Sequence, residues 1–551
     1  MTSTADSSMY NLVDERWLNA RLLDGSTTTL SLREAFHRAH EVRELVGELP
    51  TQTFAILRLM LAILYRLGRG RPLTEDLWQS WRETGLPLDL VDRYLDHFRD
   101  RFNLFDPRRP FFQVADLTLG NAKLQDEKMR DVTPLIFDLP TRNRLFTTRS
   151  GTGAVDLSFA EAARWVINAQ AFDVSGIKSG ANGDSRVTGG KGLPIGVGWS
   201  GLLGGIYACG QSLRDTLLLN LIPAASFEDP NPSADIPPWE DEEPDTAAER
   251  KDLIVSGPVR LYTWQSRRIR LFSSGDRVVG CIIANGDKLT PQNMQRFEPM
   301  TAWRFSEPQS KAAKQTTYMP RGHMPGRALW RGIGALLPGA PPRIAKREVD
   351  AWIMPGTVRR LEALAGDNLI EASELLRLRS VGVVYGSQSA VVDEVLDDGI
   401  LIPLALLRDH NRALATQAER AVALADEGVL SLRRLAENLE RAAGGEGEGA
   451  RERVGDLAYA ALDDPYRAWL SGLTDSDDPL DAIADWKGIA RGVFRALGSE
   501  LVAAASPAAW IGREVSRGGK TELITTPRAE AWYLRALAKT FGATHGKDQA
   551  A

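Results

Sequence analysis

Cysteine and histidine are scarce in this sequence, and their spacing fits no common metal site. The 551 residues include two cysteines, Cys209 and Cys281, and six histidines. No HExxH motif, CxxC motif or Cys/His cluster occurs, so we predict no metal and no other cofactor. The cysteines could form one disulfide, but two isolated cysteines in a long chain are more typical of free, buried thiols, which fits a reducing cytoplasm.

Long apolar runs are missing as well. No segment approaches the roughly 20 apolar residues that a membrane helix needs. The N-terminal residues MTSTADSSMYNLVDERW lack the basic start and the apolar core of a secretory signal. We therefore predict a cytoplasmic protein without a membrane partner.

Charge of one sign is not in large excess. The formal net charge is −5, with 43% hydrophobic and 25% charged residues, an ordinary globular composition. This balance argues against a protein coated with nucleic acid. It still leaves room for local basic patches on an acidic body.

Motifs for catalysis are weak. The segment Gly196–Gly201 reads GVGWSG and matches GxGxxG, but the βαβ context of a dinucleotide-binding loop is not evident around it. The segment SRGGKT at 516–521 ends like a phosphate-binding loop, yet Glu514 stands where that motif needs its first glycine. We predict no catalytic residues and no enzyme. The alternative that stays open is a nucleotide-dependent enzyme built on Gly196–Gly201.

Helical and strand-like patterns divide the chain near residue 400. Before it, helical stretches such as 51–68 mix with strand-like segments in 253–305, and a proline-rich, acidic segment at 228–250 predicts a surface loop. After it, four Ala/Leu-rich helical segments are separated by short breaks. These patterns predict an α+β fold with a large mixed domain at 1–400 and a C-terminal four-helix bundle at 401–551.

Three segments combine basic residues with aromatic residues or glycines, as nucleic-acid contacts often do. They are 142–153, 173–192 and 264–271. Glycines let a main chain approach a groove closely, and cationic side chains contact phosphates. Taken alone, each segment is more typical of a solvated basic loop. Their cations are Arg142, Arg144, Arg149, Lys178, Arg186, Lys191, Arg267, Arg268 and Arg270.

The segment VVYGSQSA at 383–390 predicts a hairpin. Valine-rich runs flank a small polar centre, which favours two strands joined by a tight turn. A turn usually carries Gly, Asn or Asp at its apex. Gln388 is unusual there because its long side chain can both donate and accept hydrogen bonds.

Several segments, in their order along the chain, resemble the CasA family of large subunits of type I-E CRISPR Cascade complexes. They include YNLVDERWL, the pattern FxLFxxxxPFxQ at Phe102–Gln113, a glycine-rich loop followed by LRDTLLLNL, LYTWQ, the Gln-tipped hairpin and the C-terminal helices. The resemblance covers nearly the whole chain. It implies a non-enzymatic subunit of an RNA-guided antiviral complex. The implied partners are the other Cascade subunits, the guide CRISPR RNA, double-stranded target DNA with its short PAM sequence, and a helicase-nuclease that the complex recruits.

The resemblance also implies a wedge that opens the PAM duplex and starts R-loop formation. This wedge maps to Gln388, with Ser387 and Ser389 on either side. An inserted side chain can offset an unstacking cost of a few kcal/mol with new contacts.

Two further elements that the family brings to the PAM map less sharply. A glycine loop maps to Gly176 and Gly180, with Lys178 nearby. A lysine finger maps to Lys288, although spacing along the sequence also favours Arg296. Contacts of this kind in the minor groove would give a permissive PAM preference.

Two other surfaces complete the expected contacts. A loop that the family places against the guide RNA and neighbouring subunits maps to Asn143, Arg144, Leu145 and Phe146. Cations spaced by 4 or 7 residues on two helices of the bundle predict basic faces for DNA, with solvated helix faces as the alternative. These are Lys487, Arg491 and Arg495, and Arg528, Arg535 and Lys539. A third interpretation of the whole chain is a scaffold subunit without DNA contact.

Overall fold

The computed structural model of the chain describes residues 9–68, 70–139, 155–228, 230–324, 326–338, 343–344, 348–370, 375–517 and 520–542. The chain forms two compact units. The first contains Met1–Arg327, Pro341–Leu361 and Arg377–Gly399, and the second contains Ala328–Ala340, Glu362–Leu376 and Ile400–Ala551. The second unit therefore takes in two segments that the sequence-based division assigned to the first domain.

The first unit begins with a small antiparallel sheet in the order β2-β1-β3. Its strands are β1 (Leu18–Leu22), β2 (Thr27–Leu30) and β3 (Val42–Leu45). The helix α1 (Leu32–His37) follows β2 and starts with a capping box, in which Ser31 and Glu34 satisfy each other's backbone N–H groups.

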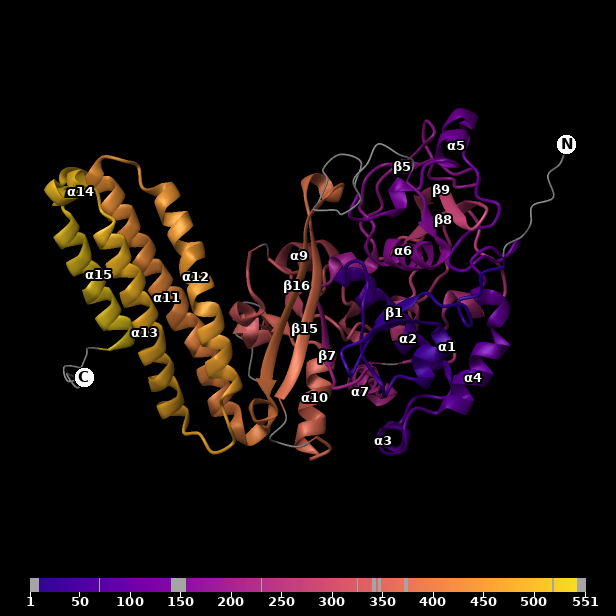
Figure 1. The fold of residues 1–551 in the computed structure, drawn as a ribbon, viewed down its shortest axis with the longest axis horizontal. Coiled ribbons are helices and arrows are strands. Elements are labelled where there is room, and N and C mark those ends of the chain that lie inside the picture. The colour runs from indigo at the N-terminus through magenta and orange to yellow at the C-terminus, as the bar shows by residue number, and fades with distance from the viewer. Residues whose placement is uncertain are drawn as a thin grey trace. The chain divides into compact units, whose positions relative to one another are not determined.

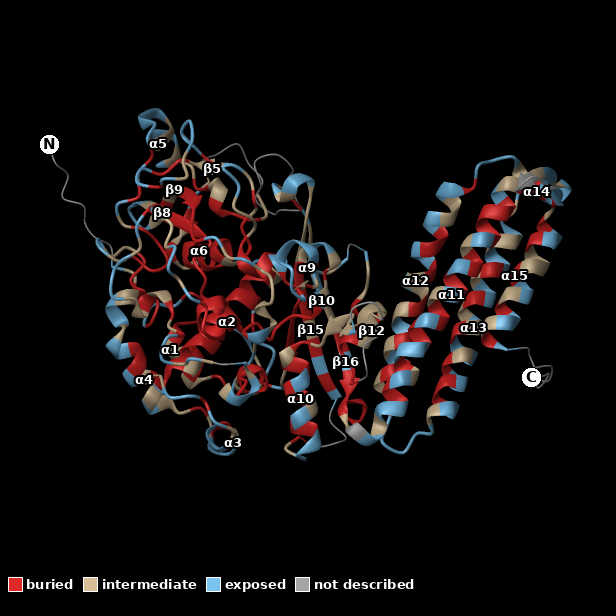
Figure 2. Cartoon of the chain, turned by 180° about the vertical axis from the view of Figure 1, so that it is seen from behind, coloured by how far each residue is buried: buried red, intermediate tan, exposed pale blue. Residues whose placement is uncertain are grey.

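Two buried helices form the centre of the first unit (Figure 2). Helix α2 (Pro50–Arg66) is apolar nearly all round and starts with proline at its first position, where no backbone N–H is needed. Helix α6 (Phe159–Phe172) packs against it. The expectation that the stretch 51–68 forms a buried helix is confirmed.

Shorter elements surround these two helices. The helices are α3 (Glu75–Thr84), α4 (Leu88–His97), α5 (Ala122–Lys128), α7 (Leu213–Asn220), α8 (Pro258–Tyr262) and α9 (Glu307–Ala313), and α10 (Gly356–Gly366) follows later in the chain. Short strands are β10 (Trp303–Phe305), β11 (Tyr318–Pro320), β12 (Arg343–Ile344), β13 (Val349–Asp350) and β14 (Trp352–Ile353).

Three antiparallel sheets carry the segments that the sequence singled out. The first has the order β4-β9-β8, with β4 (Leu157–Ser158), β8 (Arg267–Ser274) and β9 (Arg277–Asn285). The second is the ribbon of β5 (Lys178–Ser179) and β6 (Lys191–Gly192). The third has the order β16-β15-β7, with β7 (Gly205–Cys209), β15 (Leu375–Tyr385) and β16 (Val392–Pro403).

The pattern FxLFxxxxPFxQ stabilises the edge of β8. The carboxamide of Gln113 accepts a hydrogen bond from the Leu271 N–H at 2.9 Å and donates to the Leu104 carbonyl at 2.9 Å. The rings of Phe102 and Phe111 stack 5.2 Å apart. The motif thus pairs a buried polar side chain with an aromatic cluster, and both serve packing.

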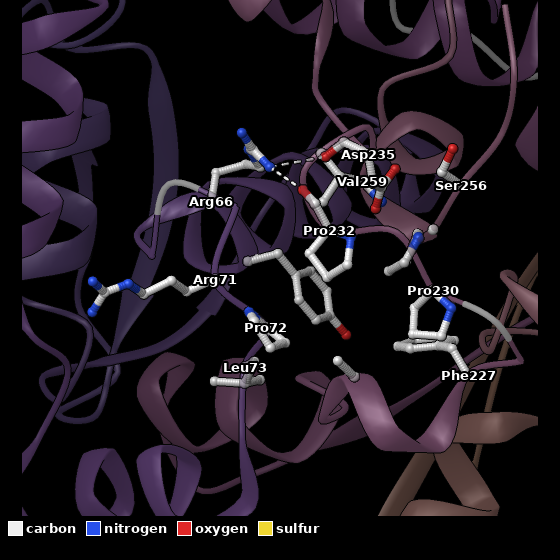
Figure 3. A pocket seen from close by; sticks show the side chains of 14 residues that line it. Arg66, Arg71, Pro72, Leu73, Phe227, Pro230, Pro232, Asp235, Ser256 and Val259 are labelled. Carbon is white, nitrogen blue, oxygen red and sulfur yellow. Dashed lines mark hydrogen bonds between the residues drawn. The ribbon is translucent and has the colours of Figure 1, made fainter.

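The acidic segment 228–250 is mostly an irregular loop with many exposed residues, as its composition predicted, but several of its residues are anchored in the first unit. Arg66 forms a buried ion pair with Glu240 at 2.7 Å. It also donates to the carbonyls of Pro232 and Asp235 (Figure 3). Arg260 pairs with Asp241 at 2.7 Å. Composition predicted the exposed loop but not these anchors, because the arginine partners lie far away in the sequence.

The second unit contains the predicted bundle. Helices α11 (Arg412–Ala443), α12 (Glu448–Ser471), α13 (Pro479–Ala503) and α15 (Thr526–Phe541) run side by side (Figure 1). Gly444 ends α11 in the left-handed conformation at φ 102°, as a C-terminal glycine cap does. The predicted fold class, α+β with a C-terminal helical bundle, is confirmed.

Two elements between α13 and α15 were not predicted. They are the short helix α14 (Pro507–Ile511) and the hairpin of β17 (Arg513–Arg517) and β18 (Lys520–Ile524). None of the described helices is long and apolar enough to cross a membrane.

Candidate nucleic-acid interface

The segment VVYGSQSA forms the tip of a long hairpin, as predicted. Strands β15 and β16 are 11 and 12 residues long and are joined by a short turn at 386–391. Gln388 lies at the apex with φ 54° and ψ 21°, and Ser389 also has a positive φ of 54°. Left-handed backbone at residues other than glycine costs roughly 1–2 kcal/mol each, so the surrounding structure must hold this turn.

Backbone hydrogen bonds inside the turn provide part of that support. Gly386 donates to the carbonyl of Val391 at 3.0 Å, and Ser389 and Ala390 donate back to Gly386 and Ser387 at 2.9 and 3.0 Å. The side chain of Gln388 is exposed and has no hydrogen-bond partner among the described residues. The turn is therefore rigid in its backbone while the apical carboxamide remains available to a partner.

The glycine loop lies directly against this tip. The Ser175 N–H donates to the Ser389 carbonyl at 2.7 Å. A Cβ atom on Gly176 would lie 3.7 Å from the Ala390 side chain. Two predicted elements that are more than 200 residues apart in the sequence, the wedge and the glycine loop, are thus neighbours.

Tyr385, the last residue of β15, makes a second connection. Its hydroxyl donates to the Phe172 carbonyl, at the end of α6, over 2.6 Å. The same ring occupies the space beside Gly201, where a Cβ atom would clash with the hydroxyl. The end of β15 is thus fixed to the end of the buried helix α6.

Glycines inside the loop serve close backbone packing. A Cβ on Gly180 would lie 2.6 Å from the Gly190 carbonyl, and one on Gly192 would lie 2.9 Å from the Asn285 side chain. Ribbon β5–β6 pairs Lys178 with Gly192 and packs on β9. The close approach that was predicted for these glycines is made to other parts of this chain.

Lys178 does not face solvent, contrary to its predicted role as an exposed cation. Its ammonium forms an ion pair with Asp173 at 2.5 Å and its side chain is 11% exposed. Burial lowers the pKa of Lys178, and the attraction of Asp173 opposes that shift. The lysine therefore serves the interior of the loop, because a buried carboxylate next to it needs a counter-charge.

Arg267 shares that carboxylate from the other side. It donates to Asp173 at 2.5 Å and to the carbonyls of Val174 and Gly196 at 2.8 Å each. Burial alone would raise the pKa of Asp173, but the charges of Lys178 and Arg267 outweigh it and hold this pKa below its ordinary value. Arg267 is 1% exposed and so cannot contact nucleic acid directly.

Arg268 holds a second loop in the same manner. It pairs with Asp287 at 2.6 Å and donates to the carbonyls of Thr246 and Ala248. Asp287 directly precedes Lys288, whose side chain is exposed. Two of the three arginines that the sequence offered here as DNA contacts, Arg267 and Arg268, are thus buried supports for the loops on either side of β8.

The two candidates for the lysine finger are both exposed cations. Lys288 follows the end of β9, and Arg296 ends a short 3-10 turn at Met294–Arg296 with its guanidinium 4.9 Å from the Phe297 ring. Neither side chain has an acidic partner among the described residues, although the Lys288 backbone N–H donates to Glu249 at 3.3 Å. Within the first unit, both side chains are therefore free to contact DNA. The predicted guide-RNA loop, with Asn143, Arg144, Leu145 and Phe146, lies outside the described residues.

The bundle cations differ in how free they are. On α13, Arg495 is exposed, whereas Lys487 and Arg491 are half-buried and Arg491 reaches the Gly542 carbonyl at 3.5 Å. On α15, Arg528 pairs with Glu522. Arg535 and Lys539 are exposed. The two helices pack together, since the Tyr533 hydroxyl donates to the Phe494 carbonyl at 2.6 Å.

The segment Gly196–Gly201 lacks the context of a dinucleotide-binding loop. It leads into a 3-10 turn at Trp199–Leu202 and then into the antiparallel strand β7. Its glycines allow close packing, and a Cβ on Gly198 would lie 2.5 Å from the Ala171 backbone. The described ends of the segment 516–521 belong to the paired strands β17 and β18, where Ser516 lies opposite Thr521, and not to a strand followed by a helix. Both phosphate-binding alternatives therefore lose their structural basis.

Sequence reasoning missed the residues that join the elements. Asp173, Ser175 and Tyr385 were not singled out, although each connects the glycine loop or the hairpin to its surroundings. Only Tyr385 had a local signal, because it directly precedes the turn residue Gly386. The others depend on contacts between distant segments, which no local pattern reveals.

Comparisons with known proteins agree with this architecture. The family described as CRISPR-associated protein Cse1 matches residues 11–497. The CRISPR-associated protein CasA/Cse1 of Thermus thermophilus is 30% identical over 544 residues, which is 96% of this chain and 95% of that protein.

Solved structures show the same fold. Cse1 of Thermobifida fusca is 39% identical with a TM-score of 0.88, over 98% of this chain and 100% of that chain. Cse1 of Acidimicrobium ferrooxidans is 30% identical with a TM-score of 0.79, over 97% and 98% of the two chains. With a family match across most of its length and relatives of this identity, the chain belongs to the CasA/Cse1 family of CRISPR-associated proteins.

Proposed function

We propose that this chain is the large subunit of a type I-E Cascade complex, in which it reads the PAM duplex and opens it to start R-loop formation. The observation that carries the proposal is the hairpin tip, where an exposed Gln388 sits on a strained backbone that hydrogen bonds hold in place. Strained backbone in a rigid surrounding is typical of functional sites.

The neighbouring loops support the same role. The glycine loop touches the tip through Ser175, and Lys288 follows a residue that Arg268 anchors. A rigid apex beside a backbone-lined loop and an exposed cation suits a distorted minor groove, where shape and A·T against G·C character are read. Gly176, Gly180, Lys288 and Arg296 remain the proposed contacts or supports, together with Ser387 and Ser389.

The proposed partners follow from the family. The chain assembles with the other Cascade subunits and the guide CRISPR RNA, contacts the guide through the loop at 143–146, and provides the platform for a helicase-nuclease in antiviral defence. In this proposal the chain has no catalytic role of its own, and the target sequence beyond the PAM is read by base pairing with the guide.

Gln388→Ala in a reconstituted complex tests the wedge. We expect PAM-duplex binding to persist in part while R-loop formation slows about tenfold or more, because the inserted side chain no longer offsets unstacking. Stopped-flow fluorescence of a base analogue next to the PAM measures the opening rate.

Two controls separate the wedge from a damaged turn. Gln388→Gly removes the side chain but accepts the left-handed backbone, so it should fold at least as well and slow opening equally. A target with a pre-opened bubble needs no splitting and should form R-loops at the wild-type rate. Equal opening rates for wild type and both variants on intact duplex would contradict the proposal.

A further inference from the structure

A cavity in the first unit has no part in the proposed DNA contacts. It has a volume of about 370 Å³, including the space open to solvent, and lies between the end of α2, the segments 71–73 and 224–235, and the residues around the start of α8 (Figure 3). None of the described residues that line it belongs to the hairpin or to the glycine loop. A space of this size suits one large side chain better than a drug-sized molecule.

The lining is mainly apolar and rich in proline. Figure 3 shows Pro72 and Leu73 on one side of the cavity and Phe227 and Pro230 on the other. Proline has no backbone N–H, so these walls offer few hydrogen-bond donors. Such walls favour an apolar group with a flat face, as an aromatic side chain has.

Arg66 and Asp235, two charged residues of the lining, are already engaged. Arg66 forms its buried ion pair with Glu240 at 2.7 Å. The Asp235 carboxylate accepts hydrogen bonds from the backbone N–H groups of Val259 and Arg260 at 2.9 and 2.8 Å. A charged group inside the cavity would therefore find neither of them free, which again favours an uncharged occupant.

Backbone hydrogen bonds between the wall segments fix the shape of the cavity. The Ala224 N–H donates to the Leu73 carbonyl at 2.9 Å, and the Asn231 N–H donates to the Ser256 carbonyl at 3.0 Å. A preformed site needs little ordering when a partner binds, and this favours affinity.

Tyr65 provides a hydrogen-bond donor in the lining. Its hydroxyl accepts from the Ile222 N–H at 2.8 Å, and its own proton has no acceptor among the described residues. Burial raises the pKa of Tyr65, so the hydroxyl keeps this proton. A neutral acceptor such as a peptide carbonyl would satisfy the donor.

Two exposed side chains extend this surface beyond the cavity. Arg71 is exposed, has no acidic partner among the described residues, and points outward from the rim (Figure 3). Ile254 is 78% exposed and lies two residues before Ser256 of the lining. A polypeptide can contact the cavity and both side chains at once, whereas a small molecule would fill the cavity alone.

We propose that the cavity holds an aromatic side chain from a short linear segment of a partner protein. The ring lies between the walls of proline and phenylalanine, and a peptide carbonyl accepts from the Tyr65 hydroxyl. A carboxylate next to the aromatic residue pairs with Arg71 outside the cavity, and a further apolar residue covers Ile254. This docking site goes beyond the proposed function and does not depend on the DNA contacts of the hairpin.

The experiment measures, by fluorescence anisotropy, how the purified full chain binds a fluorescein-labelled peptide with a central Phe-Asp pair. Matched peptides carry Ala-Asp or Phe-Asn instead. Loss of the aromatic ring should weaken binding about tenfold or more, because a side chain that fills a pocket carries much of the binding energy. Loss of the carboxylate should weaken binding about two- to fivefold, as expected for an exposed ion pair.

Variants of the chain assign the binding to this cavity. Ala224→Phe adds a ring to the lining without removing a hydrogen-bonding group, and it should weaken binding of the Phe-Asp peptide about tenfold or more. Ala225→Phe is the matched control, because this neighbour is exposed and outside the lining, and it should bind like wild type. Arg71→Gln should remove the difference between the Phe-Asp and Phe-Asn peptides.

Three results would overturn the proposal. One is equal binding of the Phe-Asp and Ala-Asp peptides to wild type, a comparison that remains decisive even if Ala224→Phe fails to fold. Another is an equal effect of Ala224→Phe and Ala225→Phe. The third is a wild-type chain that self-associates in analytical ultracentrifugation while Ala224→Phe stays monomeric, because the occupant would then be a second copy of this chain.

Discussion

Individual side chains in this protein gain their roles from partners far along the chain. Arg267 and Asp173 lie 94 residues apart and form a buried pair. From sequence alone Arg267, Arg268 and Lys178 look like exposed cations, because a basic residue is most often solvated. Gln388 could be located from its local turn pattern, whereas the inward direction of Lys178 could not, since it depends on a buried acid beside it.

His323 gives the first unit a sensitivity to mild acid. Its ring is half-buried, lies 2.6 Å from the Ser380 hydroxyl, and faces the backbone at Gly204 and Gly382. Burial lowers the pKa of His323 to about 4, although Asp398 opposes the shift. Below about pH 6.5, His323 is protonated in the unfolded chain but stays neutral in the folded chain. The folded state therefore becomes less stable as the pH drops from 6.5 toward 4.

We expect His323 to lower the free energy of unfolding by about 1 kcal/mol when the pH falls from 7.5 to 5.5. This value allows for partial solvent screening. Urea unfolding of wild type and His323→Gln at both pH values measures it. The variant should lose less stability than wild type over that interval. Parallel pH profiles for the two proteins would show that His323 is not the sensitive group.

At the scale of elements, local patterns were sufficient where a helix or hairpin is determined by its own residues. Helix α2, the Gln-tipped hairpin and the bundle helices follow from periodicity, turn residues and caps. The anchoring of the acidic segment 228–250 did not follow, because it depends on distant arginines. Strands β17 and β18 were not predicted, although the Gly-Gly pair at 518–519 in the sequence is a recognised hairpin signal.

The contacts of Arg267 between β8 and the glycine loop can be tested by substitution. Arg267→Met leaves Asp173 with Lys178 alone and removes the bonds to three loop carbonyls, so the unfolding free energy should fall by about 3–5 kcal/mol. Backbone amides of Ser175 and Gly198 should exchange with solvent faster. Urea unfolding and hydrogen exchange followed by mass spectrometry measure the two effects.

Arg270→Met is the matched control on the same strand. Arg270 is half-buried and its guanidinium donates to the Leu117 carbonyl at 3.0 Å, a single bond to a neutral acceptor, so its loss should cost less than about 1 kcal/mol. Faster exchange at Ser175 in both variants would mean that a general loosening of β8, and not the loss of the Arg267 contacts, increases the mobility of the glycine loop.

For the whole molecule, net charge is a poor guide to nucleic-acid contact. The total of −5 includes carboxylates such as Glu240 and Asp287 that buried arginines neutralise. What a DNA strand meets is the local field of free cations. The bundle faces on α13 and α15 offer several, although Arg528 is already paired with Glu522.

Salt dependence of DNA binding by the whole complex tests those faces. Changing Lys487, Arg491 and Arg495 to glutamine should lower the slope of log affinity against log salt by up to about 3, if each contacts one phosphate. Changing the exposed Arg420, Arg434 and Arg453 on α11 and α12 should leave the slope unchanged. If the slopes of both triple variants equal that of wild type, the α13 cations are solvated and do not contact DNA.

The adjacent positions of Arg267 and Arg268 also restrict how this family can vary in length. One arginine serves the glycine loop and the next serves the loop before Lys288, from opposite sides of β8. A single inserted or deleted residue just ahead of the strand would exchange the two sides, so that each guanidinium would meet the wrong loop. Insertions should therefore accumulate at loop tips, while the short stretch from Trp264 to Arg268 keeps a fixed length across relatives.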